Sequence, residues 1–334
     1  MRGRLMFACI FILSLCGCRK ELCYTHDEHS LGVRINLLAD WELEWERDYG
    51  CGWKDCWNSE WTCRYDDLRP EVPEGIRLIA YHESGISKDF HLKPSGRTVV
   101  LGDEGKYSFL LHNDDTEYIV YDNLNSSKDA CASTRTSSRA EFRSPNEGER
   151  VMNQPDMLFG RYIGNFDVER KTETETVQLE MRPLVYTYWL RLEFSSGYQY
   201  VSSARGLFAG MAEKVYLYDG HTGAESASIM FDCEKGENDM SARVMTFGVP
   251  NYPGDHYVKQ REDGCFMIRL QLNMINGLYK LFDIDISDQM IRQPRGGVIK
   301  LDGLKISKED LASGSGGFDV GVDEWDDPIE IPLN

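Results

Sequence analysis

Short segments in which apolar and polar residues alternate recur along the whole chain, and this pattern restricts the fold more than any other feature. In residues 31–37 every second residue is Leu, Val or Ile, which is the period of a strand with one buried face. Comparable β-rich segments, bounded by Gly, Pro, Asn, Asp and Ser, lie at residues 75–81, 98–101, 107–111, 117–121, 177–181, 184–194, 214–218, 228–231 and 242–249. Many short strands separated by turn signals predict an all-β chain.

A polar segment divides this series of strands. Residues 123–156 are mostly small, polar or charged, and they predict an interdomain or long-loop segment. A chain of 334 residues is long enough for about two domains. We therefore expect two tandem β-sandwich domains, residues 18–156 and residues 157–312. Within the second domain, the small residues at 206–211 predict an interruption between strands.

Residues 265–286 predict a β-hairpin that turns at Asn276 and Gly277. Its apolar residues share one face only if the loop has an odd number of residues or the ladder carries a bulge. A plain two-residue turn would instead place Leu270 opposite Asp283. We therefore expect an odd-numbered loop or a bulge.

The N-terminus has the parts of a lipoprotein signal peptide. Arg2 and Arg4 precede an apolar run that is too short to span a bilayer, and Leu15-Cys16-Gly17-Cys18 resembles a bacterial lipobox. We expect residues 1–17 to be removed and Cys18 to carry the lipid, for example palmitate, so that acyl chains alone anchor the protein. An ordinary secretory signal peptide is the alternative.

The C-terminus predicts a strand on a flexible tether. Residues 313–317 read Ser-Gly-Ser-Gly-Gly, which is the composition of a flexible linker. In the acidic tail that follows, Ile329, Ile331 and Leu333 alternate with Glu330 and Pro332. Residues 313–334 are therefore expected to form a separate C-terminal element.

Charge and motifs exclude several classes of function. The chain has 55 Asp and Glu against 37 Lys and Arg, so no excess of positive charge exists to neutralise a nucleic acid. The sequence has neither a phosphate-binding glycine motif nor a Gly-x-Ser-x-Gly elbow. Asp283, Asp285 and Asp288 lack the spacing of an EF-hand and are interpreted as the solvent face of a strand. We expect a non-enzymatic protein without cofactor or metal.

Residues 42–67 form a loop rich in cysteine and tryptophan. The cysteine spacing matches no standard zinc site, and a disulfide is the stronger expectation in an oxidising compartment. The tryptophans either form an exposed platform for a glycan or a protein partner, or pack over the end of the first sandwich. The residues concerned are, in order, Cys51, Trp53, Cys56, Trp57, Trp61 and Cys63.

Several short motifs occur in a specific order along most of the chain. They lie at residues 19–26, 40–41, 107–117, 154–160, 183–186, 206–211, 246–248 and 283–289. In this order they resemble the fimbrillin-like (fimbrillin A/Mfa-type) outer-membrane lipoproteins of Gram-negative anaerobes. The resemblance implies two transthyretin-like, or Ig-like, β-sandwich domains.

The resemblance also implies how such a chain assembles. In that family an Arg-specific protease removes the first strand, and the C-terminal strand of a neighbour fills the groove by β-augmentation. Residues 31–37 would then be the strand that is replaced, and Ile329, Ile331 and Leu333 would belong to the donor strand. Arg34 and Arg47 are candidate cleavage sites without a clear protease motif, and an uncleaved chain would act as an anchor or accessory subunit.

The sequence therefore leads to one principal hypothesis and one alternative. The principal hypothesis is a lipid-anchored protein of the outer membrane, at the cell surface, that serves as a fimbrial anchor or accessory subunit in pilus assembly and cell adhesion. Its partners would be the membrane, through the lipid on Cys18, and other fimbrial subunits. The alternative is a surface lipoprotein that binds a glycan or a host ligand through Trp53, Trp57 and Trp61.

Overall fold

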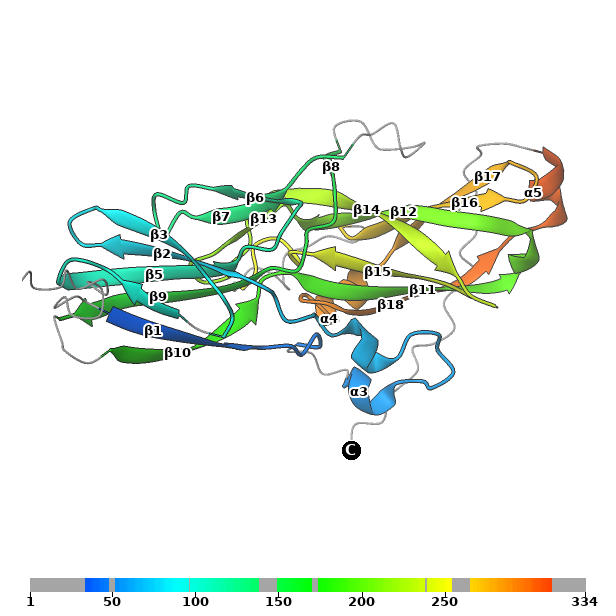
Figure 1. Ribbon diagram of the computed structural model, residues 1–334. Coiled ribbons are helices and arrows are strands. Elements are labelled where there is room, and N and C mark those ends of the chain that lie inside the picture. Colours follow the sequence, from blue (N-terminus) through cyan, green and yellow to red (C-terminus); the bar gives the residue numbers. More distant parts are fainter. Residues whose placement is uncertain are drawn as a thin grey trace, which may run out of the picture.

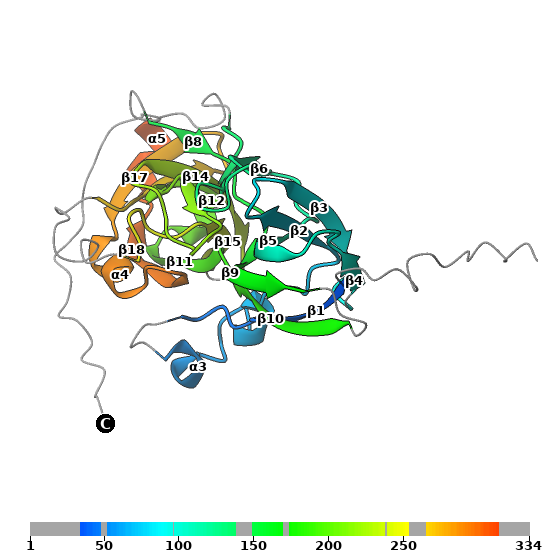
Figure 2. The same cartoon turned by 90° about the vertical axis from the view of Figure 1, so that its left-hand side faces the viewer.

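Two β-sheets, joined end to end, make up most of the molecule (Figures 1 and 2). The computed structural model describes residues 34–47, 52–95, 97–137, 149–169, 174–237, 239–253 and 265–313. None of the helices in this part of the chain is long and apolar enough to cross a membrane. The predicted signal peptide with Cys18 and the predicted C-terminal strand lie outside the described residues. The expectation of an all-β chain is confirmed.

The first sheet has seven strands and folds around one core. Side chains of β1 (Arg34–Trp41), such as Ile35, share that core with Leu78 and Phe109 from strands at the other side of the sheet, so the sheet curves around the core. The strands, in sheet order, are β3 (Ser87–Leu92), β2 (Ile76–His82), β5 (Gly105–Asn113), β9 (Phe159–Val168), β10 (Glu175–Pro183), β1 (Arg34–Trp41) and β4 (Arg97–Val100).

The second sheet has eight strands and surrounds the largest cluster of buried apolar residues. Tyr188, Leu190 and Leu192 point into that core from one strand, as the alternation in residues 184–194 predicts. The strands, in sheet order, are β17 (Tyr279–Asp285), β16 (Met267–Met274), β12 (Val201–Ala212), β14 (Ser226–Lys235), β15 (Asp239–Thr246), β11 (Tyr186–Ser196) and β18 (Gly297–Lys305), and β8 (Val151–Met152) pairs with β14.

A small third sheet and a shared core connect the two bodies. The sheet consists of β6 (Ile119–Asp122), β7 (Cys131–Thr134) and β13 (Lys214–Tyr216), so it combines strands from both halves of the sequence. Buried side chains from both halves, including Leu110 and Phe247, form one cluster at this junction. Helices are short: α3 (Trp53–Cys56), α4 (Ser287–Arg292), α5 (Lys308–Ser313) and the 3₁₀ turns η1 (Tyr65–Leu68) and η3 (Tyr198–Tyr200).

The expected boundary between the two domains, after residue 156, can be compared with the pairing of the strands that follow it. Strands β9 and β10 follow residue 156 in the sequence but pair within the first sheet. Apart from the two-residue strand β8, which pairs with β14, the described chain enters the second sheet at Tyr186. We therefore propose a domain boundary near Leu184, because the polar composition of residues 123–156 does not determine which sheet the next strand joins.

The predicted hairpin is confirmed, including its register. Strands β16 and β17 pair with Leu270 opposite Phe282 and Ile268 opposite Ile284, so the apolar side chains share one face. The amide of Met274 donates to the carbonyl of Leu278 at 2.7 Å, which leaves three residues in the loop. Gly277 has a φ of 85°, which is the left-handed conformation that such a loop requires.

The predicted interruption at residues 206–211 is wrong, because this segment lies inside β12. Gly206 faces the ring of Phe231, and a Cβ atom there would lie 2.5 Å from Phe231 Cζ. Gly210 has a φ of 89° next to a register shift between Phe208 and Met211, as in a β-bulge. The glycines therefore allow close packing and a bulge within a strand.

Candidate functional site

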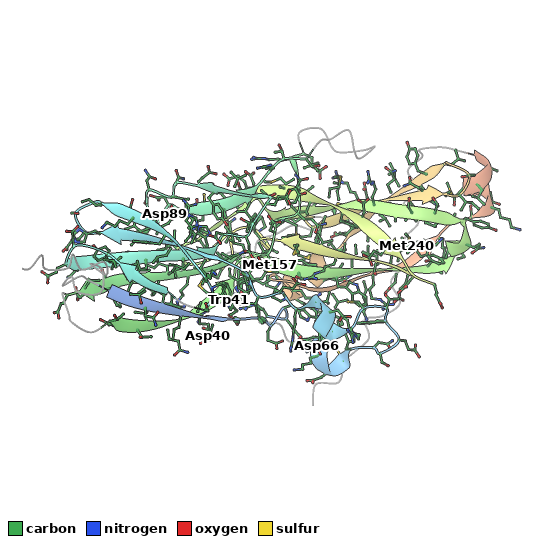
Figure 3. All side chains as sticks on the ribbon, viewed as in Figure 1. Asp40, Trp41, Asp66, Asp89, Met157 and Met240 are labelled. Atoms are coloured by element: carbon green, nitrogen blue, oxygen red, sulfur yellow. The ribbon has the colours of Figure 1, made fainter. Side chains whose placement is uncertain are left out.

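The first strand, β1, is paired on both sides. It runs parallel to β10 along residues 35–41, whereas β4 pairs with residues 34–37 only. Ile35 and Leu37 are buried in the first core. Trp41, at the end of β1, packs edge to face on Phe159 with 5.1 Å between ring centroids, near the junction of the two bodies (Figure 3). This strand, expected from residue 31 onward, is the one that the resemblance marks as replaceable.

Residues 42–67, which we call the tryptophan loop, follow β1, and the tryptophans of the described part of this loop, 42–47 and 52–67, pack against the second sheet. Trp57 stacks on Trp189 of β11, with ring centroids 5.1 Å apart and an interplanar angle of 26°. Trp61 also contacts Trp189, at 5.1 Å. Val298 of β18 belongs to the same cluster. The tryptophans thus pack on the second sheet and not over the end of the first.

Two basic side chains of the second sheet make cation–π contacts with the ring faces of tryptophans of this cluster. The guanidinium of Arg191 lies 4.5 Å from the centroid of Trp61. The ammonium of Lys300 lies 5.7 Å from the centroid of Trp53 and 5.6 Å from that of Trp61. Such contacts stabilise the loop on the sheet. Because these faces already have partners within the chain, the geometry favours packing over an open platform for sugars.

Glu46 organises the backbone of the tryptophan loop. Its carboxylate accepts hydrogen bonds from the amides of Trp53 (2.6 Å) and Lys54 (3.2 Å), which are the first amides of α3. A carboxylate at this position satisfies donors that have no partner within a helix. The hydroxyl of Tyr65 donates to the same carboxylate at 2.9 Å, and burial together with Glu46 raises the pKa of Tyr65. Residues before and after α3 are thereby held together.

The described cysteines of the loop are thiols. Cys56 is exposed and Cys63 is half-buried, and burial is the main cause that raises the pKa of each. A raised pKa keeps a thiol protonated and less reactive. Cys51, which the sequence offers as a disulfide partner, lies outside the described residues.

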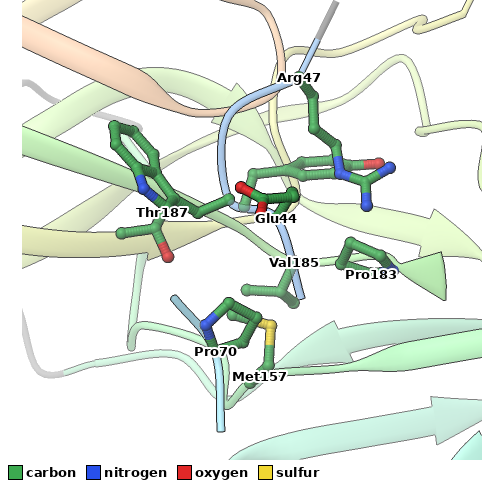
Figure 4. A pocket seen from close by; sticks show the side chains of 9 residues that line it. Glu44, Arg47, Pro70, Met157, Pro183, Val185 and Thr187 are labelled. Atoms are coloured by element: carbon green, nitrogen blue, oxygen red, sulfur yellow. The ribbon is translucent and has the colours of Figure 1, made fainter. Parts of the chain in front are cut away.

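Arg47 lies at the junction of the two bodies. It lines a small cavity of about 10 Å³ with Glu44, Val185 and Thr187 (Figure 4). Its side chain is 11% exposed and forms an ion pair with Glu42 at 2.9 Å. Of the two candidate cleavage sites, Arg47 is therefore shielded by the fold, whereas the side chain of Arg34 lies outside the described part.

The three aspartates near residue 285 do not form a cluster for a cation. Asp285 accepts hydrogen bonds from the amide and the hydroxyl of Ser287, at 2.9 and 2.6 Å, and thus fixes the start of α4. Asp283 lies 3.7 Å from Arg269. Across the described ranges, no group of three or more His, Cys, Asp or Glu is arranged to hold a metal ion.

The amino-acid sequence alone does not identify the partners of the tryptophan loop on the second sheet. Trp189 and Arg191 are only 2% and 7% exposed, although they alternate with the core residues of β11. A tryptophan on the face of a strand that should be polar was the available signal. That signal predicts that something covers the outer face of the strand, but it does not say which segment does so.

Comparisons with known proteins agree with this architecture. The family model described as "Domain of unknown function (DUF5119)" matches residues 65–232. The Bacteroides ovatus protein named "Putative fimbrium anchoring subunit Fim4B" is 22% identical over 298 residues, which cover 81% of this chain and 88% of that protein. These findings confirm the resemblance to fimbrillin-like proteins that the sequence motifs indicate.

One solved structure supports the fold. A crystal structure described as "a putative adhesin" from Bacteroides ovatus has a TM-score of 0.54 and 19% identity, and the match covers 87% of this chain and 99% of that chain. The fimbrial anchor protein Mfa2 from Porphyromonas gingivalis has a TM-score of 0.42 and 10% identity, with coverage of 80% and 90%. The adhesin structure shows that the two-body all-β architecture is shared.

Proposed function

This chain belongs to the family described as Domain of unknown function (DUF5119), and from that premise we propose that it is a non-enzymatic, lipid-anchored subunit of a fimbrial assembly. It would serve as an anchor or accessory subunit in pilus assembly and cell adhesion. The observation that carries this proposal is the similarity to a protein named as a fimbrium anchoring subunit, which extends over 88% of that protein. The lipobox before Cys18 supports an attachment to the outer membrane.

The setting of the first strand supports the role of an anchor. A subunit that polymerises through its groove must lose this strand, whereas a subunit at the membrane end keeps both strand and lipid. β1 pairs with a strand on each side. Arg47, six residues after the end of β1, has a largely buried side chain at the junction of the two bodies. A protease needs an accessible, locally unfolded segment, so cleavage at Arg47 is disfavoured. We propose that β1 stays in place and that residues 318–334 supply the contact to the next subunit.

Deletion of residues 318–334 tests the assembly part of the proposal. We expect wild-type protein, extracted from native outer membranes without boiling, to run in complexes with other fimbrial subunits. Without the tail, the alternating side chains Ile329, Ile331 and Leu333 and the main chain between them cannot add to a partner sheet. The deleted protein should therefore run as a monomer.

A second variant tests the same contact without shortening the tail. Replacing Ile329, Ile331 and Leu333 by serine retains the residues but removes the apolar face, and it should weaken the complexes in the same way. Complexes that persist in both variants would show that the tail is not the assembly contact.

A further inference from the structure

β18 is an end strand of the second sheet. Among the described residues it pairs with β11 on one side, and no strand lies on its other side. Every second residue of such a strand directs its N–H and C=O groups outward, where they can pair with a strand of another chain. In β18 these outward residues include Val298 and Lys300.

Two glutamines of the α4 region occupy these outward groups. Gln293 donates from Nε2 to the carbonyl of Val298 at 2.9 Å and accepts from the amide of Val298 at 2.8 Å. Gln289 donates to the carbonyl of Lys300 at 2.8 Å and accepts from its amide at 2.9 Å. Each side-chain amide therefore makes the pair of hydrogen bonds that a residue of a neighbouring strand would make.

The spacing of the two elements explains why a short helix can replace a strand here. Residues four apart on a helix lie on the same side, about 6 Å apart along the axis. Two residues along a strand span about 6.6 Å. Gln289 lies in α4 and Gln293 directly follows it, so both face one side, and the helix lies beside β18 in Figures 1 and 2. The side chains thus match alternate residues of β18.

Several contacts hold this helix in place. Asp285 fixes its first turn through Ser287, and Met290 is buried in the core of the second sheet. Gln293 is 3% exposed, and its Oε1 also accepts a hydrogen bond from Nε1 of Trp53 at 2.8 Å. The tryptophan loop therefore fixes one of the two amides as well as covering the outer side chains of the same strand.

We infer that Gln289 and Gln293 act as a surrogate strand that seals the edge of β18. The seal keeps an extended strand of a second copy of this chain from adding to the C-terminal body. Strand addition is thereby directed away from this edge, whichever fimbrial role the chain has. When the amides are removed, two adjacent sets of backbone groups of β18 lose their partners and α4 is held less firmly, so that a strand of a second copy displaces α4 and pairs with this edge.

Methionine substitutions test the inference, because methionine has nearly the volume and helix propensity of glutamine but no amide. The full chain without its signal peptide would carry Gln289→Met, Gln293→Met or both. Hydrogen exchange should quicken by about tenfold at the amide of Lys300 in the first variant and at that of Val298 in the second, as expected for the loss of one hydrogen bond. The double variant should form dimers at high concentration in light scattering, whereas the wild type stays monomeric.

Controls separate the seal from general destabilisation. Gln178→Met removes an exposed glutamine of β10 that bonds to Asp40, and it should change neither exchange in β18 nor the mass in solution. Trp53→Phe removes the donor to Gln293 but keeps an aromatic ring beside Lys300, and it should raise exchange at Val298 but not at Lys300. Gln289→Met leaves the buried Gln293 in place, so it tests the seal even if the double variant fails to fold.

Two results would overturn the inference. Unchanged exchange at Val298 and Lys300 in folded variants would show that the amides do not protect the edge. Faster exchange in a double variant that stays monomeric at every concentration would show that the open edge does not accept a strand.

Discussion

Replacing Trp189 with alanine is expected to lower the free energy of unfolding by about 3–5 kcal/mol, the usual range for a buried tryptophan. Trp189 is 2% exposed and contacts both Trp57 and Trp61. Its removal leaves a cavity under the tryptophan loop and takes away the stacking partner of Trp57. Urea unfolding followed by circular dichroism measures the loss.

The same variant should release the tryptophan loop before the molecule unfolds. Lys54 and Arg64 are exposed trypsin sites within the loop, and cleavage there requires the loop to open locally. We expect faster cleavage at both sites in native buffer. Phe109→Ala is the matched control, because this residue is fully buried in the first core and is not part of the tryptophan cluster on the second sheet. It should reduce stability to a similar extent but leave cleavage in the loop slow, and equal cleavage of Trp189→Ala and wild type would contradict the packing described above.

Acidification is expected to destabilise the N-terminal body through His112. This side chain on β5 is fully buried, its Nδ1 hydrogen-bonds to the carbonyl of Asn113 at 2.7 Å, and its ring stacks on Tyr121 with centroids 4.3 Å apart. Burial lowers the pKa of His112 from 6.5 to about 4, an effect to which the nearby Arg77 contributes. The native state therefore holds this imidazole neutral.

The sign of the pH effect follows from that depressed pKa. Above pH 6.5 the histidine is neutral in both states, whereas between pH 6.5 and pH 4 only the unfolded chain takes up the proton. Stability is thus lost as the pH falls through this range, by up to about 3 kcal/mol from this group alone. Denaturant unfolding at pH 7, 5.5 and 4 measures the total loss, to which carboxylates also contribute.

A variant isolates the part of the loss that comes from His112. His112→Phe keeps the ring stack on Tyr121 but cannot take up a proton, so its stability should fall less between pH 7 and pH 4 than that of the wild type. His91→Gln, which removes an exposed histidine paired with Asp114, should fall as the wild type does. A loss in His112→Phe as large as in the wild type would show that His112 does not couple folding to pH.

Local patterns in the sequence were sufficient to predict many of the strands, but they missed β3, β9 and β18 and did not give the order of the strands in the sheets. Alternation locates β1, β2 and β11, and the parity of the hairpin residues fixes how β16 meets β17. The parallel pairing of β1 with β10 joins residues about 140 positions apart, and no local period encodes such a pairing. For the same reason, no local pattern in the sequence indicates that β9 and β10 belong to the first sheet.

The candidate site shows the same limit. The composition of residues 42–67 identifies a tryptophan-rich loop, and Trp189 stands out on a face of β11 that should be polar. Nothing in either segment alone says that they meet, because their contact depends on how the two bodies are joined. The glycines of β12 were misinterpreted for a related reason, since the close approach of Phe231 that requires Gly206 is a tertiary feature.

The central claim is that the mature chain keeps both its lipid and its first strand, and intact mass spectrometry of protein from native outer membranes tests it most directly. The account predicts one main species that begins at an acylated Cys18 and retains the first strand. A species that begins after Arg34 or after Arg47, or one without acyl chains, would contradict the role of a membrane anchor.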